Sequence, residues 1–303
     1  MRFIDSYFYN PTFWQKVLSL TLLPLSFLYA ISALLRRKLS RYYDFNLPII
    51  SVGNLVLGGS GKTPFIIEVA KRYEKVVIIS RGYKRQSKGL LIVSLWGRLQ
   101  CGEKESGDEA YLLAKSVKNA SVIVSKNRVE AIEKAKELGA KCIFLDDGFR
   151  FNFKKLNLIL QPKLKPYFPF PIPSGMYREM PYLYKSADLL VREGIEYTRE
   201  VAVENESERM LLLTAIANPS RLDEFLPKVV GKITLRDHAR FDEEFLKSQI
   251  MHFQATSFLV TTKDEVKLQD MGFQLSVLCL KLHIKDEVLQ AIDSYIKSFR
   301  EYF

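Results

Sequence analysis

Short apolar runs alternate with stretches of helical periodicity along the first half of the chain. The runs predict strands that are buried on both faces, at residues 47–52, 75–80, 90–95, 121–124, 141–145 and 156–160. Apolar positions three and four residues apart predict helices between them, at residues 63–73, 109–117 and 128–138. This alternation predicts an α/β fold with a doubly wound, mostly parallel sheet, whose ligands gather at the carboxyl ends of its strands.

A second, smaller α/β domain is predicted in the last third of the chain. Its strands are expected near residues 211–215, 232–235, 258–261 and 276–280, and a final helix from about residue 286. The acidic stretch at 204–208 lacks apolar residues and is predicted to be the linker ahead of this domain. A proline-rich loop is predicted at residues 162–173.

The N-terminal segment from Val17 to Leu35 carries no charge. As a helix it would extend about 28 Å, close to the ~30 Å apolar core of a bilayer. A basic flank follows at once, made of Arg36, Arg37, Lys38 and Arg41. Such a flank is typical of the cytoplasmic side of a membrane, where the body of the protein is then expected. The segment is predicted to associate with a membrane, as a span or as a helix in one leaflet; a buried core helix is the alternative.

The net charge of +11 predicts an acidic partner: nucleic acid, anionic lipid or a phosphorylated substrate. Neither a recognition helix nor a module of interleaved aromatic and basic residues accompanies this charge, so nucleic acid is not expected. Cys101, Cys142 and Cys279 have no metal-ligand spacing and are odd in number, which favours a reducing compartment. The sequence gives no sign of an obligate protein partner.

The segment after the first predicted strand carries the most specific chemical pattern. It runs Gly58-Gly59-Ser60-Gly61-Lys62-Thr63 and opens a predicted helix. In a P-loop, such glycines let backbone N–H groups surround phosphates, the lysine reaches the β and γ phosphates, and the threonine hydroxyl binds Mg²⁺. Val56 stands where the usual pattern has glycine, but strand, loop and helix follow in the required order. These six residues are therefore predicted to bind nucleotide phosphates, and Lys62 is also a predicted catalytic residue.

A second pattern is the apolar run at 142–145, which ends in Asp146-Asp147-Gly148. P-loop folds hold magnesium with a carboxylate at the end of such a strand. If both aspartates continued the strand, their side chains would point to opposite sides, one to the metal and one to neighbours or water. The predicted metal ligands are Thr63, Asp146 and Asp147, and Asp147 is also predicted to be catalytic.

Three further stretches gain meaning only in combination. Ser80-Arg81-Gly82-Tyr83-Lys84-Arg85 follows a predicted buried strand, and a solvated basic loop is its alternative explanation. Gly107-Asp108-Glu109-Ala110 starts a predicted helix, where Asp108 could serve only as an N-cap. Arg236-Asp237-His238 follows a strand of the second predicted domain, where a single histidine is usually structural.

The P-loop, the Asp146-Asp147-Gly148 pattern and the three further stretches together resemble the tetraacyldisaccharide 4′-kinase family of lipid A biosynthesis, and they occur in the order typical of that family. The resemblance extends from residue 51 to about residue 264 and includes Ser51-Val52-Gly53-Asn54 ahead of the P-loop. Weaker matches lie at residues 173–179, 237–238 and 261–264. The chain departs from the family at Arg150-Phe151, where the usual pair is Gln-His, and at Ile172-Pro173-Ser174-Gly175, where the usual run is Leu-Pro-Ala-Gly.

The resemblance implies a kinase at the cytoplasmic face of the bacterial inner membrane, with ATP and Mg²⁺ as cofactors. Its glycolipid substrate would be a tetraacyldisaccharide 1-phosphate, phosphorylated on the 4′-hydroxyl to give lipid IVA. By resemblance, Asp108 is the base that accepts the proton of this hydroxyl, and His238 orients the Asp108 carboxylate. The resemblance further implies substrate contacts for four residues: Asn54, Arg81, Arg128 and Arg178.

The implied domains are a membrane-associated helical segment at 1–41, a P-loop kinase domain at 42–205 and the smaller α/β domain at 206–303. The rival function is a membrane-associated regulatory P-loop NTPase. A GTPase would carry Asn/Thr-Lys-x-Asp, and the nearest stretch, Thr262-Lys263-Asp264-Glu265, has its acid one place too early. Deviant P-loop ATPases carry a lysine just before the paired glycines, where this chain has Leu57. The two functions differ in what ATP turnover requires: a kinase needs a glycolipid acceptor, whereas a regulatory NTPase hydrolyses the nucleotide with a protein partner.

Overall fold

The structure of the protein is a computed structural model that describes residues 3–58, 60–216, 219–236, 239, 241–268 and 270–299. The described chain forms two compact units. Unit 1 lies within residues 1–62, 132–198 and 284–303, and unit 2 within residues 63–131 and 199–283. Each unit therefore combines segments that are far apart in the sequence. The domain boundaries expected after residues 41 and 205 stay a prediction.

Unit 1 contains four parallel strands in the order β6-β1-β7-β8. They are β1 (Ile49–Gly53), β6 (Cys142–Asp146), β7 (Leu156–Gln161) and β8 (Leu189–Arg192). Every residue of β1 and β6 is buried, which is the reason that both strands are predominantly apolar in the sequence. The prediction of β1, β6 and β7 is confirmed, whereas β8 was not predicted.

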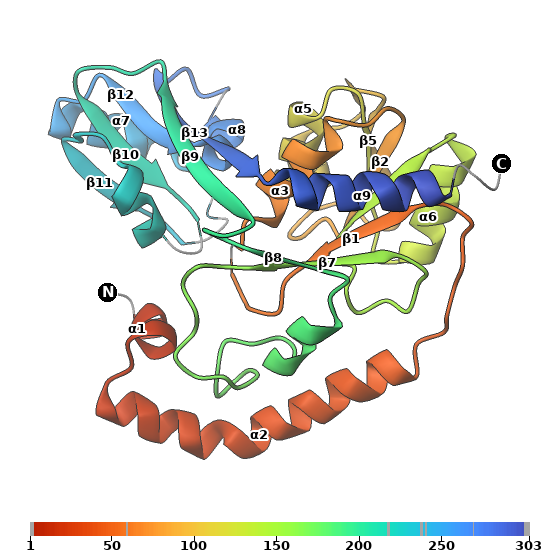
Figure 1. The fold of residues 1–303 in the computed structure, drawn as a ribbon. Coiled ribbons are helices and arrows are strands. Elements are labelled where there is room, and N and C mark those ends of the chain that lie inside the picture. Colours follow the sequence, from red (N-terminus) through yellow and green to blue (C-terminus); the bar gives the residue numbers. More distant parts are fainter. Residues whose placement is uncertain are drawn as a thin grey trace. The chain divides into compact units, whose positions relative to one another are not determined.

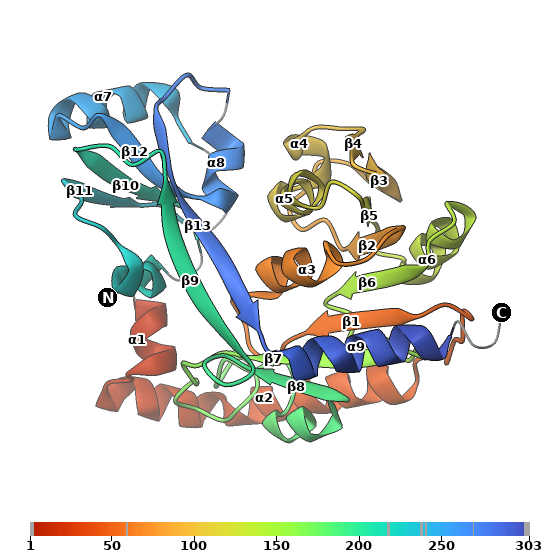
Figure 2. The same ribbon diagram turned by 45° about the horizontal axis from the view of Figure 1, so that its top comes forward.

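The helices of unit 1 come from both ends of the chain. They are α1 (Phe3–Tyr9), α2 (Phe13–Lys38), the 3-10 helix η1 (Pro181–Ser186) and α9 (Asp286–Ser298). In both ribbon views α9 lies along β1 and β7 (Figures 1 and 2). It buries Val288, Ile292 and Ile296, whose spacing of four residues forms a single apolar stripe on the helix.

Unit 2 contains the strands β2, β3, β4 and β5, which continue the α/β alternation. The elements are α3 (Lys62–Ala70), β2 (Val76–Ser80), β3 (Leu91–Leu95), β4 (Arg98–Leu99), α4 (Glu103–Ser106), α5 (Asp108–Ser116) and β5 (Ser121–Val124). Helix α6 (Arg128–Glu137) begins in unit 2, and its larger part, from Ile132 onward, belongs to unit 1. Strand β2 pairs with β5 in parallel, and β3 pairs antiparallel with β5 and β4. Strands alternate with helices in both units, and the strand pairs are mostly parallel, so the predicted α/β fold is confirmed.

A second sheet of five strands has the order β11-β10-β12-β13-β9. Its strands are β9 (Tyr197–Glu204), β10 (Met210–Thr214), β11 (Gly231–Thr234), β12 (Ser257–Thr261) and β13 (Leu275–Ile284). The helical elements that follow its strands are η2 (Pro219–Phe225), α7 (Glu243–Phe253) and α8 (Thr262–Leu268). The predicted second α/β sheet is therefore present, and the acidic segment at 204–208 connects β9 to β10.

Helix α2 has its polar and apolar faces exchanged relative to an ordinary surface helix. Its buried residues are Gln15, Ser19, Ser26 and Ala30. Its exposed residues include Phe13, Trp14, Leu20, Leu25, Phe27 and Leu28, each at least half exposed. The Ser19 hydroxyl donates to the Ser174 carbonyl at 2.9 Å, and the Ser26 hydroxyl accepts from the Ser174 amide at 2.8 Å.

Helix α2 is also long and apolar enough to cross a membrane, because it has 26 residues and an 18-residue window with a mean hydropathy of 2.0. Only 17% of its most apolar window is buried in the protein, so the alternative of a buried core helix is wrong. An exposed apolar helix surface of this size is typical of a site that meets a membrane or a partner. In Figure 1, α2 is the long red-to-orange helix at the lower edge of the ribbon.

Candidate active site

The predicted P-loop connects the carboxyl end of β1 to the start of α3, as its sequence requires. Gly58 and Gly61 have φ angles of 89° and 83°, in the left-handed region where a side chain is strained. Gly59 lies outside the described residues. Ser60 is buried, and its Oγ has no hydrogen-bond partner among the residues that the structure describes. A buried hydroxyl of this kind fits a loop whose remaining partner is a phosphate oxygen.

Asp147 joins the P-loop lysine to an arginine from a later segment. Lys62 Nζ lies 3.4 Å from Asp147 Oδ1 and donates to Asn54 Oδ1 at 3.1 Å. Arg178 donates one N–H to each oxygen of the Asp147 carboxylate, both at 3.0 Å, and a further N–H to Asn54 Oδ1. Four predicted site residues of unit 1 therefore meet in one hydrogen-bonded group, which we call the Asp147 cluster: Asn54, Lys62, Asp147 and Arg178.

The charges of the cluster fix the protonation state of its carboxylate. Burial by itself would raise the pKa of Asp147, but the positive charges of Lys62 and Arg178 outweigh it and hold that pKa well below its usual range. The bidentate contact from Arg178 also restricts the plane of the carboxylate. Asp147 is thus an oriented anion at physiological pH, available to a cation or to water.

The two adjacent aspartates are not related as consecutive residues of a strand. Asp146 is the last residue of β6 and is buried, whereas Asp147 has a φ of 55°, so the chain turns there. The alternation of side chains along a strand therefore does not extend to Asp147. The prediction that the Asp146 and Asp147 side chains point to opposite sides depended on both residues continuing the strand, which they do not. The φ value and the Arg178 contact determine where its carboxylate points.

The residues present fit a magnesium nucleotide. Mg²⁺ on a nucleotide keeps phosphate oxygens and water as ligands, so one or two carboxylates and a hydroxyl suffice from the protein. Asp146 and Asp147 stand at the end of β6, and Thr63 follows the P-loop lysine. In the described ranges no group of three or more His, Cys, Asp or Glu side chains forms a metal site by itself. That composition suits a metal held mainly by phosphate and water.

Arg150 anchors the backbone next to the cluster. Its Nε lies 2.5 Å from the carboxylate of the buried Glu179, and its Nη2 donates to the Arg178 carbonyl at 2.9 Å. The same nitrogen donates to the Tyr29 hydroxyl of α2 at 3.1 Å, and that hydroxyl also donates to the Arg178 carbonyl. Arg150 therefore connects α2 to Arg178, the residue that orients Asp147. It stands at one of the two positions where the chain departs from the family pattern.

In unit 2, Asp108 is buried and is the first residue of α5. The N-cap is Gly107, at a φ of 86°, so the interpretation of Asp108 as the N-cap is wrong by one position. Asp108 Oδ1 accepts from the Glu109 amide at 3.0 Å. Its Oδ2 lies 3.3 Å from Lys267 Nζ and 3.7 Å from Lys263 Nζ. The carboxylate is thus held between a helix N-terminus and two ammonium groups.

The weak match at 261–264 explains how these lysines are placed. Asp264 is buried and accepts from the hydroxyls of Thr214 and Thr261, both at 2.9 Å, and from the Ala215 amide at 3.2 Å. These bonds fix the start of α8, from which Lys263 and Lys267 extend. Neither lysine was predicted to be a site residue, although Lys263 lies in the weak family match, and their spacing of four residues on a helix is a signal that they share a face.

The other predicted site residues differ in environment. Arg128 is buried and donates to the carbonyls of Ser80 and Ser125, at the carboxyl ends of β2 and β5. Arg85 donates to the carbonyl of Val124 at 3.2 Å, whereas Arg81 is exposed directly after β2. Substrate contacts of Arg81 and Arg128 stay predictions. His238, the predicted partner of Asp108, lies outside the described residues.

Relatives and a solved structure are similar to this chain over nearly its whole length. The family LpxK, described as tetraacyldisaccharide-1-P 4′-kinase, matches residues 18–297. A tetraacyldisaccharide 4′-kinase of Helicobacter pylori is 55% identical, over 98% of this chain and 96% of the relative. That of Campylobacter jejuni is 42% identical, over 98% of this chain and 97% of the relative. A crystal structure of LpxK from Aquifex aeolicus in complex with ATP has a TM-score of 0.75 and 29% identity, covering 92% of this chain and 99% of that chain.

We expect Arg150→Met to lower turnover at saturating substrate by about tenfold, equivalent to about 1.4 kcal/mol, because Arg178 loses a charge-assisted anchor. Steady-state kinetics at saturating concentrations measure this. Lys134→Met is the control: it removes the same charge from an exposed ion pair with Glu137, which contributes only about 0–1 kcal/mol. Normal turnover of Arg150→Met would show that Arg178 is positioned without it.

Proposed function

The chain belongs to the tetraacyldisaccharide 4′-kinase family, and from that premise we propose which of its residues carry the reaction. It is an ATP-dependent kinase of lipid A biosynthesis, and its acceptor is the 4′-hydroxyl of tetraacyldisaccharide 1-phosphate. The observation that supports the assignment of residues most is the Asp147 cluster, which joins the P-loop lysine to an oriented carboxylate.

The P-loop residues from Gly58 to Thr63 bind the phosphates of ATP through backbone N–H groups and the Ser60 hydroxyl. Lys62 exchanges its contacts with Asn54 and Asp147 for oxygens of the β and γ phosphates, and its ammonium neutralises charge that shifts during transfer. Thr63, Asp146 and Asp147 would hold Mg²⁺, which supplies further neutralisation of phosphate charge when bound. Arg178 keeps the Asp147 carboxylate in a fixed orientation while Lys62 is engaged with phosphate.

Asp108 accepts the proton of the acceptor hydroxyl. A sugar hydroxyl does not ionise by itself at neutral pH, so a carboxylate within hydrogen-bond reach has to take its proton as the bond to phosphorus forms. The ion pairs with Lys263 and Lys267 limit the rotation of the Asp108 carboxylate. His238 orients the same carboxylate in this proposal. Asn54, Arg81 and Arg128 contact the substrate, and the glycolipid is presented at the cytoplasmic face of the inner membrane.

We expect Lys62→Ala to lower acceptor-dependent release of ADP by more than about 10²-fold, since the electrostatic contact to the transferred group is lost. The assay compares ADP release with and without the tetraacyldisaccharide acceptor. Lys71→Ala, which removes a lysine paired with Glu68 on the surface, should retain normal turnover. If Lys62→Ala keeps more than about a tenth of the activity, the P-loop lysine does not carry the chemistry.

Asp108→Ala and His238→Ala should each lower turnover by about 10²-fold or more, as losses of a general base do. Because residues that act as a unit are not additive, the double variant should be little worse than the weaker single variant. Asp223→Ala, in an exposed pair with Lys232, serves as the control and should be unaffected. Fully multiplicative losses, or a His238→Ala enzyme with normal turnover, would exclude the pair.

The exposed apolar face of α2 should anchor the protein to membranes. We expect the double substitution Phe27→Gln with Leu28→Gln to remove at least half of the protein from the membrane pellet, because each buried side chain of this size contributes about 1.5–3 kcal/mol. Sedimentation after a high-salt wash measures this. Ile195→Gln with Met251→Gln, which changes exposed apolar residues elsewhere, is the control. Unchanged sedimentation of the α2 variant would place the anchor in another part of the chain.

A further inference from the structure

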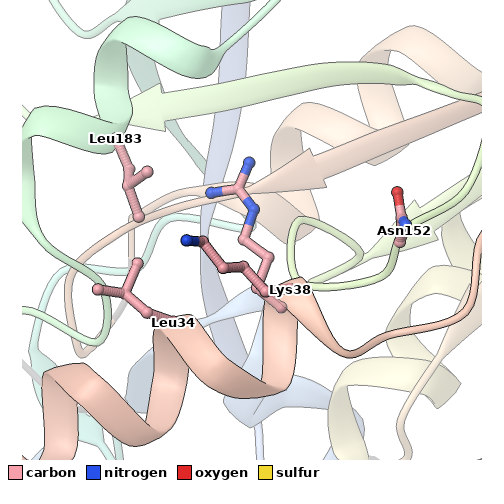
Figure 3. Close-up of a pocket in the computed structure, with 5 residues that line it drawn as sticks. Leu34, Lys38, Asn152 and Leu183 are labelled. Carbon is pink, nitrogen blue, oxygen red and sulfur yellow. The ribbon is translucent and has the colours of Figure 1, made fainter.

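Unit 1 has a pocket away from the P-loop, at the carboxyl end of α2. Its volume is about 360 Å³, and it is lined by Leu34, Arg37, Lys38, Asn152 and Leu183 (Figure 3). None of these residues belongs to the P-loop, so this pocket does not shape the phosphate site. A P-loop binds phosphates mainly through its backbone N–H groups, and its shape depends on the contacts that hold this backbone from the opposite side.

The entrance of the P-loop is held by the segment at residues 176–178. The Leu57 amide donates to the Met176 carbonyl at 2.9 Å. Val56, which replaces the first glycine of the usual pattern, is buried and forms an antiparallel bridge with Tyr177. A position of this strand-like kind does not require the conformational freedom of glycine, so the departure at Val56 is compatible with the loop.

The far end of the P-loop has a second support, which comes from Tyr197. This side chain is only 1% exposed, and its hydroxyl donates to the Ser60 carbonyl at 3.4 Å. A buried tyrosine hydroxyl usually has a polar partner, and here a backbone group of the phosphate loop is one. The contact is longer than an average hydroxyl hydrogen bond, so its effect on binding is expected to be modest.

The turn after β8 places Tyr197 at the phosphate-binding edge of the sheet. Strand β8 is parallel to β7, and β7 to β1, so the carboxyl ends of β8 and β1 lie at the same edge. Within the turn, the Arg192 amide donates to the Glu196 carboxylate and the Gly194 amide to the Tyr197 carbonyl, both at 2.7 Å. The turn is therefore fixed by its own hydrogen bonds, and it holds the Tyr197 hydroxyl at the backbone of the P-loop.

The contact with the Ser60 carbonyl also sets the direction of the next N–H group. The peptide bond between Ser60 and Gly61 is trans, so its C=O and its N–H point in opposite directions. A hydroxyl that holds the carbonyl on one side therefore directs the Gly61 N–H to the other side. Gly61, with a φ of 83°, then leads the chain into α3, which begins at Lys62.

We propose that Tyr197 is a positioning residue for the phosphates of ATP, because its hydroxyl fixes the peptide whose N–H binds them. This inference rests on the proposed role of the P-loop. Backbone N–H groups of a P-loop contact the α and β phosphates, which ADP also has and adenosine lacks. A contact that is equally strong in the ground state and the transition state lowers KM without changing kcat. Tyr197 therefore tightens the binding of the nucleotide and takes no part in the chemical step.

The test variant is Tyr197→Phe, which removes the hydroxyl and keeps the buried ring. The matched control is Tyr7→Phe, because the Tyr7 hydroxyl, also buried and in unit 1, donates to the carbonyl of Ser174 at 2.8 Å, outside the P-loop. Steady-state kinetics give kcat and the KM values for ATP and for the glycolipid acceptor. ADP and adenosine serve as competitive inhibitors against ATP, and thermal unfolding measures the stability of each variant.

We expect Tyr197→Phe to raise KM for ATP and the inhibition constant of ADP by the same factor, at least about threefold, as the loss of one neutral hydrogen bond does. The inhibition constant of adenosine, kcat and KM for the acceptor should stay within about 1.5-fold of those of the unmodified protein. Tyr7→Phe should keep all of these constants within the same range, although it also loses a buried hydrogen bond and with it some thermal stability.

Three results would overturn the proposal. The first is an unchanged KM for ATP in Tyr197→Phe, which would show that the loop does not need the hydroxyl. The second is an equal rise in Tyr7→Phe, which would indicate a general loss of stability. The third is an equal rise in the inhibition constant of adenosine, or a fall in kcat as large as the rise in KM, which would indicate a disturbance of the whole site.

A failure of the proposed function is distinct, and Lys62→Ala in the same assay detects it. If Lys62→Ala keeps its activity, the P-loop lysine does not carry the chemistry, whatever the kinetics of Tyr197→Phe. If Lys62→Ala is inactive and Tyr197→Phe has the KM of the unmodified protein, the proposed function stands and only the role of Tyr197 is overturned.

Discussion

Asp147 is held between two cations, Lys62 and Arg178, and the arrangement of the phosphate-binding end of unit 1 depends on this contact. The Asp147 carboxylate is partly buried, and its two cationic partners offset the unfavourable burial of its charge. The contact keeps the lysine near the P-loop and keeps the carboxylate ionised. It also joins the loop after β1, the turn after β6 and the segment around Arg178, which are far apart in the sequence.

Helix α2 is connected to the same group through its polar side. Tyr29 meets the backbone of Arg178, and Arg150 binds Tyr29, Glu179 and that same backbone carbonyl. The opposite side of the helix is apolar and exposed. A helix of this kind suits an enzyme whose acceptor is a lipid, because one face can meet acyl chains or membrane while the other supports the residues around the phosphate site.

Much of the fold could be predicted from the sequence because its central strands are simple to recognise. Every residue of strands β1, β2 and β6 is buried, so each strand is made mostly of apolar residues, and polar residues follow it. Strand β9 was missed because it lies at the edge of its sheet and alternates exposed residues with partly buried ones, so it forms no continuous apolar run. Its alternation with a period of two was the available signal.

The site could be predicted in part, for a similar reason. A P-loop is contiguous, so Lys62 and Thr63 follow from the sequence, and Asn54 and Arg178 followed from the family resemblance. The direction of Asp147 could not be predicted, because it results from a left-handed turn and from an arginine about thirty residues away. The lysines that surround Asp108 come from α8, far along the chain, and only the tertiary fold brings them to α5.

The central claim is that Asp147 and Arg178 act as one unit that prepares the P-loop lysine for phosphate. A double-mutant cycle on kcat/KM for ATP, with Asp147→Asn, Arg178→Gln and the combination, tests it most directly. The account predicts that each single substitution lowers kcat/KM by about 10²-fold and that the double variant is little worse than either. Losses that multiply in the double variant would show that the two residues act independently, and would contradict the account.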